Sequence, residues 1–245
     1  MKRYKKEDEH SYTLGVFPTI ELLKYKYDYV ERVYIHSSIE KNSGYPLIKE
    51  LCHKYNIEMI ESDKIINKLS PKGNCFSIGV FRKYQSQISD SNHIVLVNPM
   101  DSGNLGTIMR TMLGFGYKDL IIIRPATDVF DPKTIRASMG ALFHLNVHYY
   151  DDFITYYHEY SDHQCYPFML EGASNIHSIK DIPLHSLIFG NESSGLSIEY
   201  KDYGQSIFIP HENEIDSLNL SMAVGCALFY FSSNEFRQDE SLRRV

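Results

Sequence analysis

The sequence predicts an α/β protein whose second half contains a mainly parallel sheet. Short, continuous apolar runs at residues 93–97 and 120–123 are typical of strands that are buried on both faces. Segments with apolar residues on one helical face follow these runs. Three strands lead into polar loops that end where the next helix begins, which is where open α/β sheets bind ligands.

The first half of the chain alternates helical and extended patterns. Pro18 is predicted at the first position of a helix whose apolar face includes Ile20 and Leu23. The remaining elements of this half are strands at 32–36, 57–60 and 75–80 and helices at 47–55 and 63–69. The polar, Ser- and Gln-rich stretch 83–92 predicts a linker. We therefore expect a small α/β domain over residues 1–88 and a second domain over residues 89–245.

The second half begins with the strand at 93–97. The next helix is predicted from one apolar face, made by Leu105, Ile108, Met109, Met112 and Leu113. Asp131 and Pro132 are placed as the N-cap and first residue of another helix. Further strands are predicted at 120–123, 166–170, 186–189 and 206–209. A long last helix is predicted from the apolar face Leu220, Ala223, Val224, Ala227, Leu228 and Phe231.

Composition narrows the class of protein. The chain has 245 residues, of which 43% are hydrophobic and 23% charged, so a folded core is expected rather than a disordered chain. No apolar run is long enough to span a bilayer, and no apolar run follows the basic N-terminus as it would in a secretory signal. The four cysteines form no CxxC pair. We expect a cytoplasmic protein without a membrane span.

Charge is divided unevenly along the chain. The formal net charge is −6. Residues 1–90 carry 15 Lys and Arg against 12 Asp and Glu, and residues 91–245 carry 10 against 19, so the halves have net charges of +3 and −9. Polyanions bind local basic patches, so the first half is the better candidate for contacting phosphates. A balance of +3 is also ordinary for a domain that binds no nucleic acid.

Three polar segments, at residues 98–111, 189–197 and 209–221, each follow an apolar strand. Each has a simple structural explanation: Asn104 as a helix cap with a solvated Arg110, a helix N-terminus with a solvated Glu192, and a Ser N-cap. Together they place Gly, Asn and Ser residues, one Arg and one Glu at strand ends. This combination predicts one composite pocket at one edge of the sheet.

In these segments the sequence resembles the SpoU (TrmH-like) family of RNA methyltransferases, in the SPOUT superfamily. The three segments match the three motifs of that family in order, and the resemblance covers residues 93–233. Residues 136–143 also look like family sequence. The first half resembles, more loosely, a small α/β RNA-binding domain that many members carry, most clearly over residues 64–80.

The resemblance implies a C-terminal SPOUT domain with a deep trefoil knot, an exception to the rule that chains avoid knots. It implies that S-adenosyl-L-methionine lies in the knot, held largely by the backbone of Gly190, Ile209 and Leu218. It implies a homodimer that methylates a ribose 2′-hydroxyl of RNA, with ribosomal RNA favoured over transfer RNA. The family positions implicated in catalysis or polar contacts correspond to Asn104, Arg110, Glu192, Ser217 and Asn219.

Two residue-level questions follow from the resemblance. A guanidinium stays protonated at physiological pH, so Arg110 is either a general base in a strongly altered environment or a clamp on a phosphate beside the target ribose. We favour the clamp. The third segment is also acidic, with Glu212, Glu214 and Asp216, close to where RNA must approach.

Two other classes of protein compete with this interpretation. A non-catalytic RNA-binding protein on the same fold would not need Arg110, Glu192, Ser217 and Asn219 together. A nucleotide-dependent oxidoreductase would need a Gly-rich fingerprint, which the sequence lacks. His144 and His148 are four residues apart, but no carboxylate lies between them, so structural histidines are expected and no metal.

Overall fold

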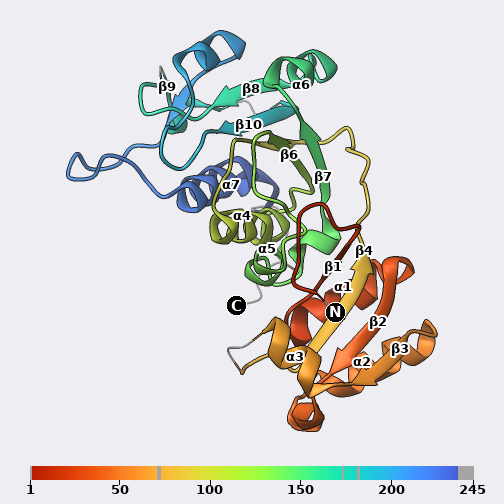
Figure 1. Cartoon of the computed structure of the whole chain (residues 1–245). Coiled ribbons are helices and arrows are strands. Elements are labelled where there is room, and N and C mark those ends of the chain that lie inside the picture. Colours follow the sequence, from red (N-terminus) through yellow and green to blue (C-terminus); the bar gives the residue numbers. More distant parts are fainter. Residues whose placement is uncertain (1, 71–72, 173, 181–182, 237–245) are drawn as a thin grey trace. The chain divides into compact units, whose positions relative to one another are not determined.

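The computed structural model describes residues 2–70, 73–172, 174–180 and 183–236. Contacts divide the chain into two compact units, and neither unit is one continuous segment (Figure 1). The first contains residues 1–85, 105–110 and 128–144, and the second contains residues 86–104, 111–127 and 145–245. Residues 237–245 of the expected second domain, and residues 71–72 of the expected first, lie outside the described residues. The domain boundary at residue 88 stays a prediction.

The first unit contains a four-stranded mixed sheet of order β1-β4-β2-β3. β2 and β3 are parallel, whereas β4 is antiparallel to both β1 and β2. The elements of this unit are β1 (His10–Tyr12), α1 (Val16–Tyr25), β2 (Val30–Ile35), α2 (Tyr45–Lys54), β3 (Glu58–Glu61), α3 (Asp63–Leu69), β4 (Ser77–Arg82) and α5 (Pro132–Ala137). The prediction that Asp131 caps α5 is confirmed, because its carboxylate accepts a hydrogen bond from Lys133 N at 2.7 Å.

One helix start in this unit was predicted wrongly. Helix α1 begins at Val16, so Pro18 is its third residue rather than its first. The backbone N–H groups of a helix's first turn have no partner within the helix, so a proline is tolerated at any of these positions. The residue type therefore indicated the first turn but not the first residue.

The second unit contains a five-stranded sheet of order β7-β6-β5-β10-β8, and all of its neighbouring strands are parallel (Figure 1). A two-stranded parallel pair, β9 and β11, accompanies it. The elements are β5 (His93–Val97), the two ends of α4 (Ser102–Gly114, whose residues 105–110 belong to the first unit), β6 (Asp119–Ile123), β7 (Asn146–Tyr150), α6 (Phe153–Glu159), β8 (Gln164–Pro167), β9 (Ser174–Asn175), β10 (His185–Phe189), β11 (Ile207–Phe208) and α7 (Leu220–Phe236). The predicted α/β fold with a mainly parallel sheet is confirmed.

Burial explains why these strands read as continuous apolar runs. Every residue of β5, β6 and β10 is buried. On α7, the predicted face is buried at Leu220, Val224, Ala227, Leu228 and Phe231. In the described part of the chain, no helix is sufficiently long and apolar to cross a membrane.

Strand order determines where a ligand can enter the second unit. The chain passes from β5 outward to β6 and β7, and then crosses to the other side of β5 to form β8 and β10. Connections therefore leave β5 and β10, which are neighbours, in opposite directions. Such a reversal leaves a crevice at the carboxyl ends of the two strands. The first two polar segments begin at these two ends.

Candidate functional site

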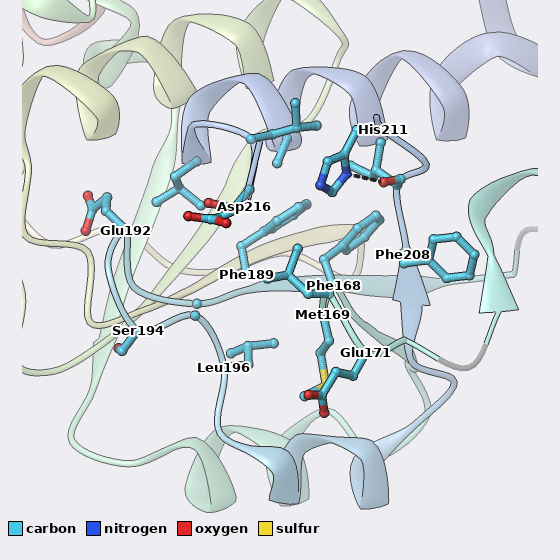
Figure 2. Close-up of a pocket in the computed structure, with 18 of the residues that line it drawn as sticks. Phe168, Met169, Glu171, Phe189, Glu192, Ser194, Leu196, Phe208, His211 and Asp216 are labelled. Carbon is cyan, nitrogen blue, oxygen red and sulfur yellow. Dashed lines mark hydrogen bonds between the residues drawn. The ribbon is translucent and has the colours of Figure 1, made fainter. Parts of the chain in front are cut away.

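A cavity of about 750 Å³ lies in the second unit (Figure 2). Its lining comes from three separate stretches of the sequence: residues 168–171 after β8, residues 189–198 at the end of β10, and residues 207–223 from β11 into the first turn of α7. Binding sites for ligands of the size of a nucleoside derivative fall in the range of about 300–1,000 Å³. Parts of the second and third predicted segments therefore line one pocket, and the pocket is large enough for a small organic molecule.

Aromatic side chains give the cavity an apolar surface. The rings of Phe168 and Phe189 are stacked, with centroids 4.5 Å apart and planes at 12° (Figure 2). Phe189 ends β10, and Phe168 directly follows β8 and bridges to Ile207. The sequence placed Phe168 inside a strand at 166–170, and the site prediction missed it. β8 ends at Pro167, so the position of Phe168 at a carboxyl strand end is seen only in the structure.

Asn191 organises the loop that follows β10. Its backbone exchanges two hydrogen bonds with Gly195, at 2.9 and 3.2 Å. Its side-chain oxygen accepts hydrogen bonds from the backbone and hydroxyl of Ser193, and its amide donates to Asn98 O at 2.7 Å. Asn commonly stabilises turns through such local bonds. The site prediction passed over this residue, although an Asn directly after the strand-end glycine indicated a turn.

Gly190 lies where two backbone segments almost touch. A Cβ atom on Gly190 would be 2.1–2.3 Å from the backbone of Gly195 and Leu196. Real Cβ atoms do not approach other atoms so closely. Only glycine allows this loop to close in its present form.

Glu192 connects the loop after β10 to the loop after β5. Its two carboxylate oxygens accept hydrogen bonds from the backbone N–H groups of Met100 and Asp101, each at 3.1 Å. The simpler expectation that Glu192 is a solvated carboxylate at a helix N-terminus is wrong, because its charge is used to hold a neighbouring loop. Hydrogen bonds to an ionised group are about twice as strong as neutral ones.

The first and third segments meet through two asparagines. The amide nitrogen of Asn219 donates to the side-chain oxygen of Asn104 at 3.1 Å. Asn104 does not cap α4, because Asp101 does so by accepting a hydrogen bond from Asn104 N at 2.7 Å. The alternative explanation of Asn104 as a helix cap is therefore wrong.

The start of α7 also differs from the simple expectation of a Ser cap. The helix begins at Leu220, and the Asn219 side chain accepts hydrogen bonds from the backbone and hydroxyl of Ser221 at 2.9 and 2.7 Å. Asn219 is thus the residue that caps α7, while Ser217 lies two residues before it in the loop. The capping bond fixes the Asn219 side chain, so its amide is held toward Asn104.

The structure brings most of the predicted site residues together. Those that line the cavity are Gly190, Glu192, Ile209, Ser217 and Leu218. Asn219 lies between two lining residues and connects to Asn104, and neither of these asparagines lines the cavity itself. Arg110 is exposed on α4 and is grouped with the first unit, and it does not line the cavity.

The two histidines that raised the question of a metal have other contacts. His144 Nε2 lies 2.6 Å from a Glu21 carboxylate oxygen, and its ring packs 3.8 Å from Tyr25. The His148 ring packs 4.8 Å from Tyr150 on the same strand. Among the described residues, no group of three or more His, Cys, Asp or Glu side chains is arranged to hold a metal ion.

Known proteins resemble this chain in sequence and in fold. The 23S rRNA (guanosine(2553)-2'-O)-methyltransferase RlmP of Bacillus subtilis (strain 168) is 24% identical over 156 residues, covering 60% of this chain and 60% of that protein. The 23S rRNA (adenosine(1067)-2'-O)-methyltransferase of Streptomyces azureus is 26% identical over 192 residues, covering 73% and 71%. The aligned region therefore spans well under the full length of these relatives.

A solved structure shares the fold over nearly the whole chain. The SpoU methyltransferase AviRb from Streptomyces viridochromogenes, in complex with the cofactor AdoMet, is 20% identical with a TM-score of 0.80. The superposition covers 94% of this chain and 92% of that one. A profile of the SpoU rRNA Methylase family matches residues 91–229, which is more than half of the chain and includes all three polar segments. The chain belongs to the SpoU rRNA methylase family.

Proposed function

We propose that this protein transfers the methyl group of S-adenosyl-L-methionine to a ribose 2′-hydroxyl of ribosomal RNA. The observation that carries the proposal is the cavity beside β10, where residues of the second and third family motifs meet. Two rRNA 2′-O-methyltransferases that align with this chain support the choice of substrate class.

The residues of the cavity fit S-adenosyl-L-methionine. Its volume of about 750 Å³ suits a nucleoside joined to an amino acid. The stacked Phe168 and Phe189 rings and Leu196 provide apolar surface for a base. Backbone groups at Gly190, Ile209 and Leu218 lie at the cavity wall, where they are available to the polar edges of the donor. We assign these three residues to donor binding.

When bound, the donor supplies a methyl group that is attached to a positively charged sulfur. After transfer, this sulfur belongs to a neutral thioether, which is a good leaving group. The chain must position the ribose and hold the loops that form the site. Glu192 joins the two loops after β5 and β10. Asn219 and Asn104 join the third motif to the first. Ser217, at the cavity wall, provides a hydroxyl for the donor or the ribose.

Arg110 is assigned to hold a phosphate beside the target ribose, with the hydroxyl proton passing to a phosphate oxygen or to water. Because a guanidinium binds phosphate through two N–H groups and an ammonium does not, Arg110→Lys should lower the methylation rate at least about tenfold. Donor affinity, measured by calorimetry, should be unchanged. The control is Arg124→Lys, at another exposed position and outside residues 1–88. An equal loss of donor affinity would instead make Arg110 a structural residue.

The substrate can be tested directly. Mapping 2′-O-methyl groups in total RNA from cells with and without the gene should reveal one or a few rRNA positions that lose the modification. If a tRNA position loses its 2′-O-methyl group instead, the substrate is tRNA and not rRNA. Unchanged maps, together with no donor binding in calorimetry, would favour a non-catalytic RNA-binding protein.

We assign residues 1–88 to RNA binding. The support is the charge difference between the halves, +3 over residues 1–90 against −9 over the rest. Ultraviolet cross-linking to the RNA substrate, followed by mass mapping of the peptides, should find most contacts before residue 90. Cross-links confined to the second half would contradict this assignment.

The protein is also proposed to be a homodimer through α7. This helix buries one face, but Met222, Cys226 and Phe229 are exposed, with Met222 at 61% and Phe229 at 67%. Their spacing places them on one side of the helix. An apolar face in water favours association. Phe229→Arg should convert a dimer to a monomer in light scattering, whereas Phe17→Arg, at an exposed position on α1, should not. A monomeric wild-type protein would contradict the proposal.

We also propose that the chain forms a trefoil knot in the second unit. Its support is the close approach of distant backbone segments at glycines. Cβ atoms on Gly172 and Gly204 would lie 2.5 Å from the Ile207 backbone and 2.2 Å from Cys165 O. An experimental density map traced continuously from residue 160 to residue 230 would show whether the chain passes through its own loop.

A further inference from the structure

The acidic residues of the third segment do not share one environment. Asp216 lines the cavity, whereas Glu212 and Glu214, in the same loop, do not. Figure 2 shows the Asp216 carboxylate on the same side of the cavity as Glu192. All three residues of the loop are exposed to solvent. The acidic stretch therefore contributes one charge to the lining of the cavity.

The cavity as a whole has an uneven charge. Three carboxylates line it, those of Glu171, Glu192 and Asp216, and its described lining contains no Lys or Arg. His211 is the single basic side chain of that lining, and its Nδ1 lies 2.9 Å from Ile209 O. The site therefore has a negative electrostatic potential wherever these carboxylates are not compensated.

Two of the three carboxylates are compensated by neighbours. Glu171 lies 3.7 Å from the Lys201 ammonium. Glu192 accepts hydrogen bonds from two backbone N–H groups. For Asp216, the described part of the chain provides neither an ion pair nor a hydrogen bond to the carboxylate. Among the described lining residues, Asp216 therefore has the one carboxylate without such a partner.

We propose that the Asp216 carboxylate makes the site prefer the positively charged donor over its neutral reaction product. This inference rests on the proposed function. S-adenosyl-L-methionine has a sulfonium, and S-adenosyl-L-homocysteine, the product, has an uncharged thioether in the same place. Apart from the methyl group on sulfur, the two ligands have the same groups. A negative charge in the cavity wall stabilises the first and has little effect on the second.

The preference has a consequence for turnover. Transfer of the methyl group removes the positive charge that the carboxylate attracts. The product is therefore held less tightly than the donor, so it leaves more readily and competes less with fresh donor. Asp216 acts here as a specificity residue, since it need not take part in the transfer itself.

The test is calorimetric titration of the full-length protein with each ligand. We expect wild-type protein to bind S-adenosyl-L-methionine more tightly than S-adenosyl-L-homocysteine. Asp216→Asn should weaken donor binding about fivefold at low salt and leave product binding within twofold. Asp216→Glu, which keeps the charge, should retain most of the preference. Glu214→Gln is the matched control, because it removes a charge from the same loop outside the cavity.

The possible outcomes separate the two proposals. Equal weakening of both ligands in Asp216→Asn, or no change in their ratio, would overturn the inference while leaving the methyltransferase intact. A similar change of the ratio in Glu214→Gln would also overturn it, because the effect would then come from overall loop charge. Failure of wild-type protein to bind either ligand would overturn the proposed function and this inference with it.

Discussion

Replacing Gly190 by alanine is expected to reduce methyl transfer by about a hundredfold or more. The added Cβ would lie 2.1–2.3 Å from backbone atoms of Gly195 and Leu196, which cannot move aside as a flexible side chain can. The loop after β10 must open, and this displaces Glu192 and the cavity wall. Displacements of about 1 Å in a positioned site cost rates of this order. Donor affinity by calorimetry and the initial methylation rate measure the effect.

Two glycine variants serve as controls. Gly114→Ala, at the end of α4, adds a Cβ with no atom within 4 Å, so donor binding should be unchanged. Gly195→Ala also adds its Cβ to open space, but Gly195 has a φ of +67°, which costs an L-residue about 1 kcal/mol. Gly195→Ala should therefore lose less activity than Gly190→Ala. If the order of these two variants is reversed, backbone strain and not close approach controls the loop.

The second large effect is acid destabilisation of the second unit. Burial lowers the pKa of His93 and of His185 from 6.5 to about 4, and it also lowers the pKa of His163. All three histidines are buried, and the His93 and His163 rings are 4.4 Å apart. In the folded protein they are therefore neutral at physiological pH.

A directed set of hydrogen bonds stabilises the neutral forms. His93 Nε2 lies 3.2 Å from Ser89 O, which can only accept, so Nδ1 of the neutral ring accepts from the Tyr156 hydroxyl at 2.9 Å. Tyr156 in turn lies 2.5 Å from Ser186 Oγ, and Ser186 Oγ lies 2.9 Å from His163 Nδ1. Protonation of His93 would place a proton on the nitrogen that now accepts, and would bury a charge beside His163.

Stability is therefore expected to fall as the pH falls from 6.5 to 4. In this window the unfolded chain binds more protons than the folded one, because its histidines titrate near 6.5. His93 and His185 together should reduce the free energy of unfolding by about 5 kcal/mol between pH 7.5 and pH 4.5. Urea unfolding at several pH values measures this. His93→Gln should remove about half of the slope, and His53→Gln, at an exposed position, should leave it unchanged. A flat profile would contradict the expectation.

The sequence predicted regular elements best where burial is two-sided. The strand predicted at 93–97 was found with the same bounds, because every residue of β5 is buried and the apolar run has clear ends. Short or exposed elements were missed. β1 and β9 have three and two residues, too few for a pattern, and α6 spans seven residues of mixed character. Such elements form because neighbouring segments complete their hydrogen bonds.

The site was predictable in its location and only partly in its detail. Strand-end loops rich in Gly, Asn and Ser pointed to one edge of the sheet, and five of the predicted residues line one cavity there. The roles of Asn191 and Phe168 were not found, because they depend on contacts with Asn98 and Phe189, which are distant in sequence. Side-chain partners of this kind have no local signature.

The sequence by itself indicated an α/β protein with a polar site after its strands, because hydrophobic periodicity and strand-end loops can be read along the chain. The order of the three motifs, which is also a property of the sequence alone, indicated the SpoU family. Only the tertiary structure placed β10 next to β5 and so brought Glu192 to the backbone of Met100 and Asp101. Only it separated Asp216 from Glu212 and Glu214. The reason is that strand neighbours and cavity walls are determined by packing between distant segments, and one-dimensional spacing does not determine that packing.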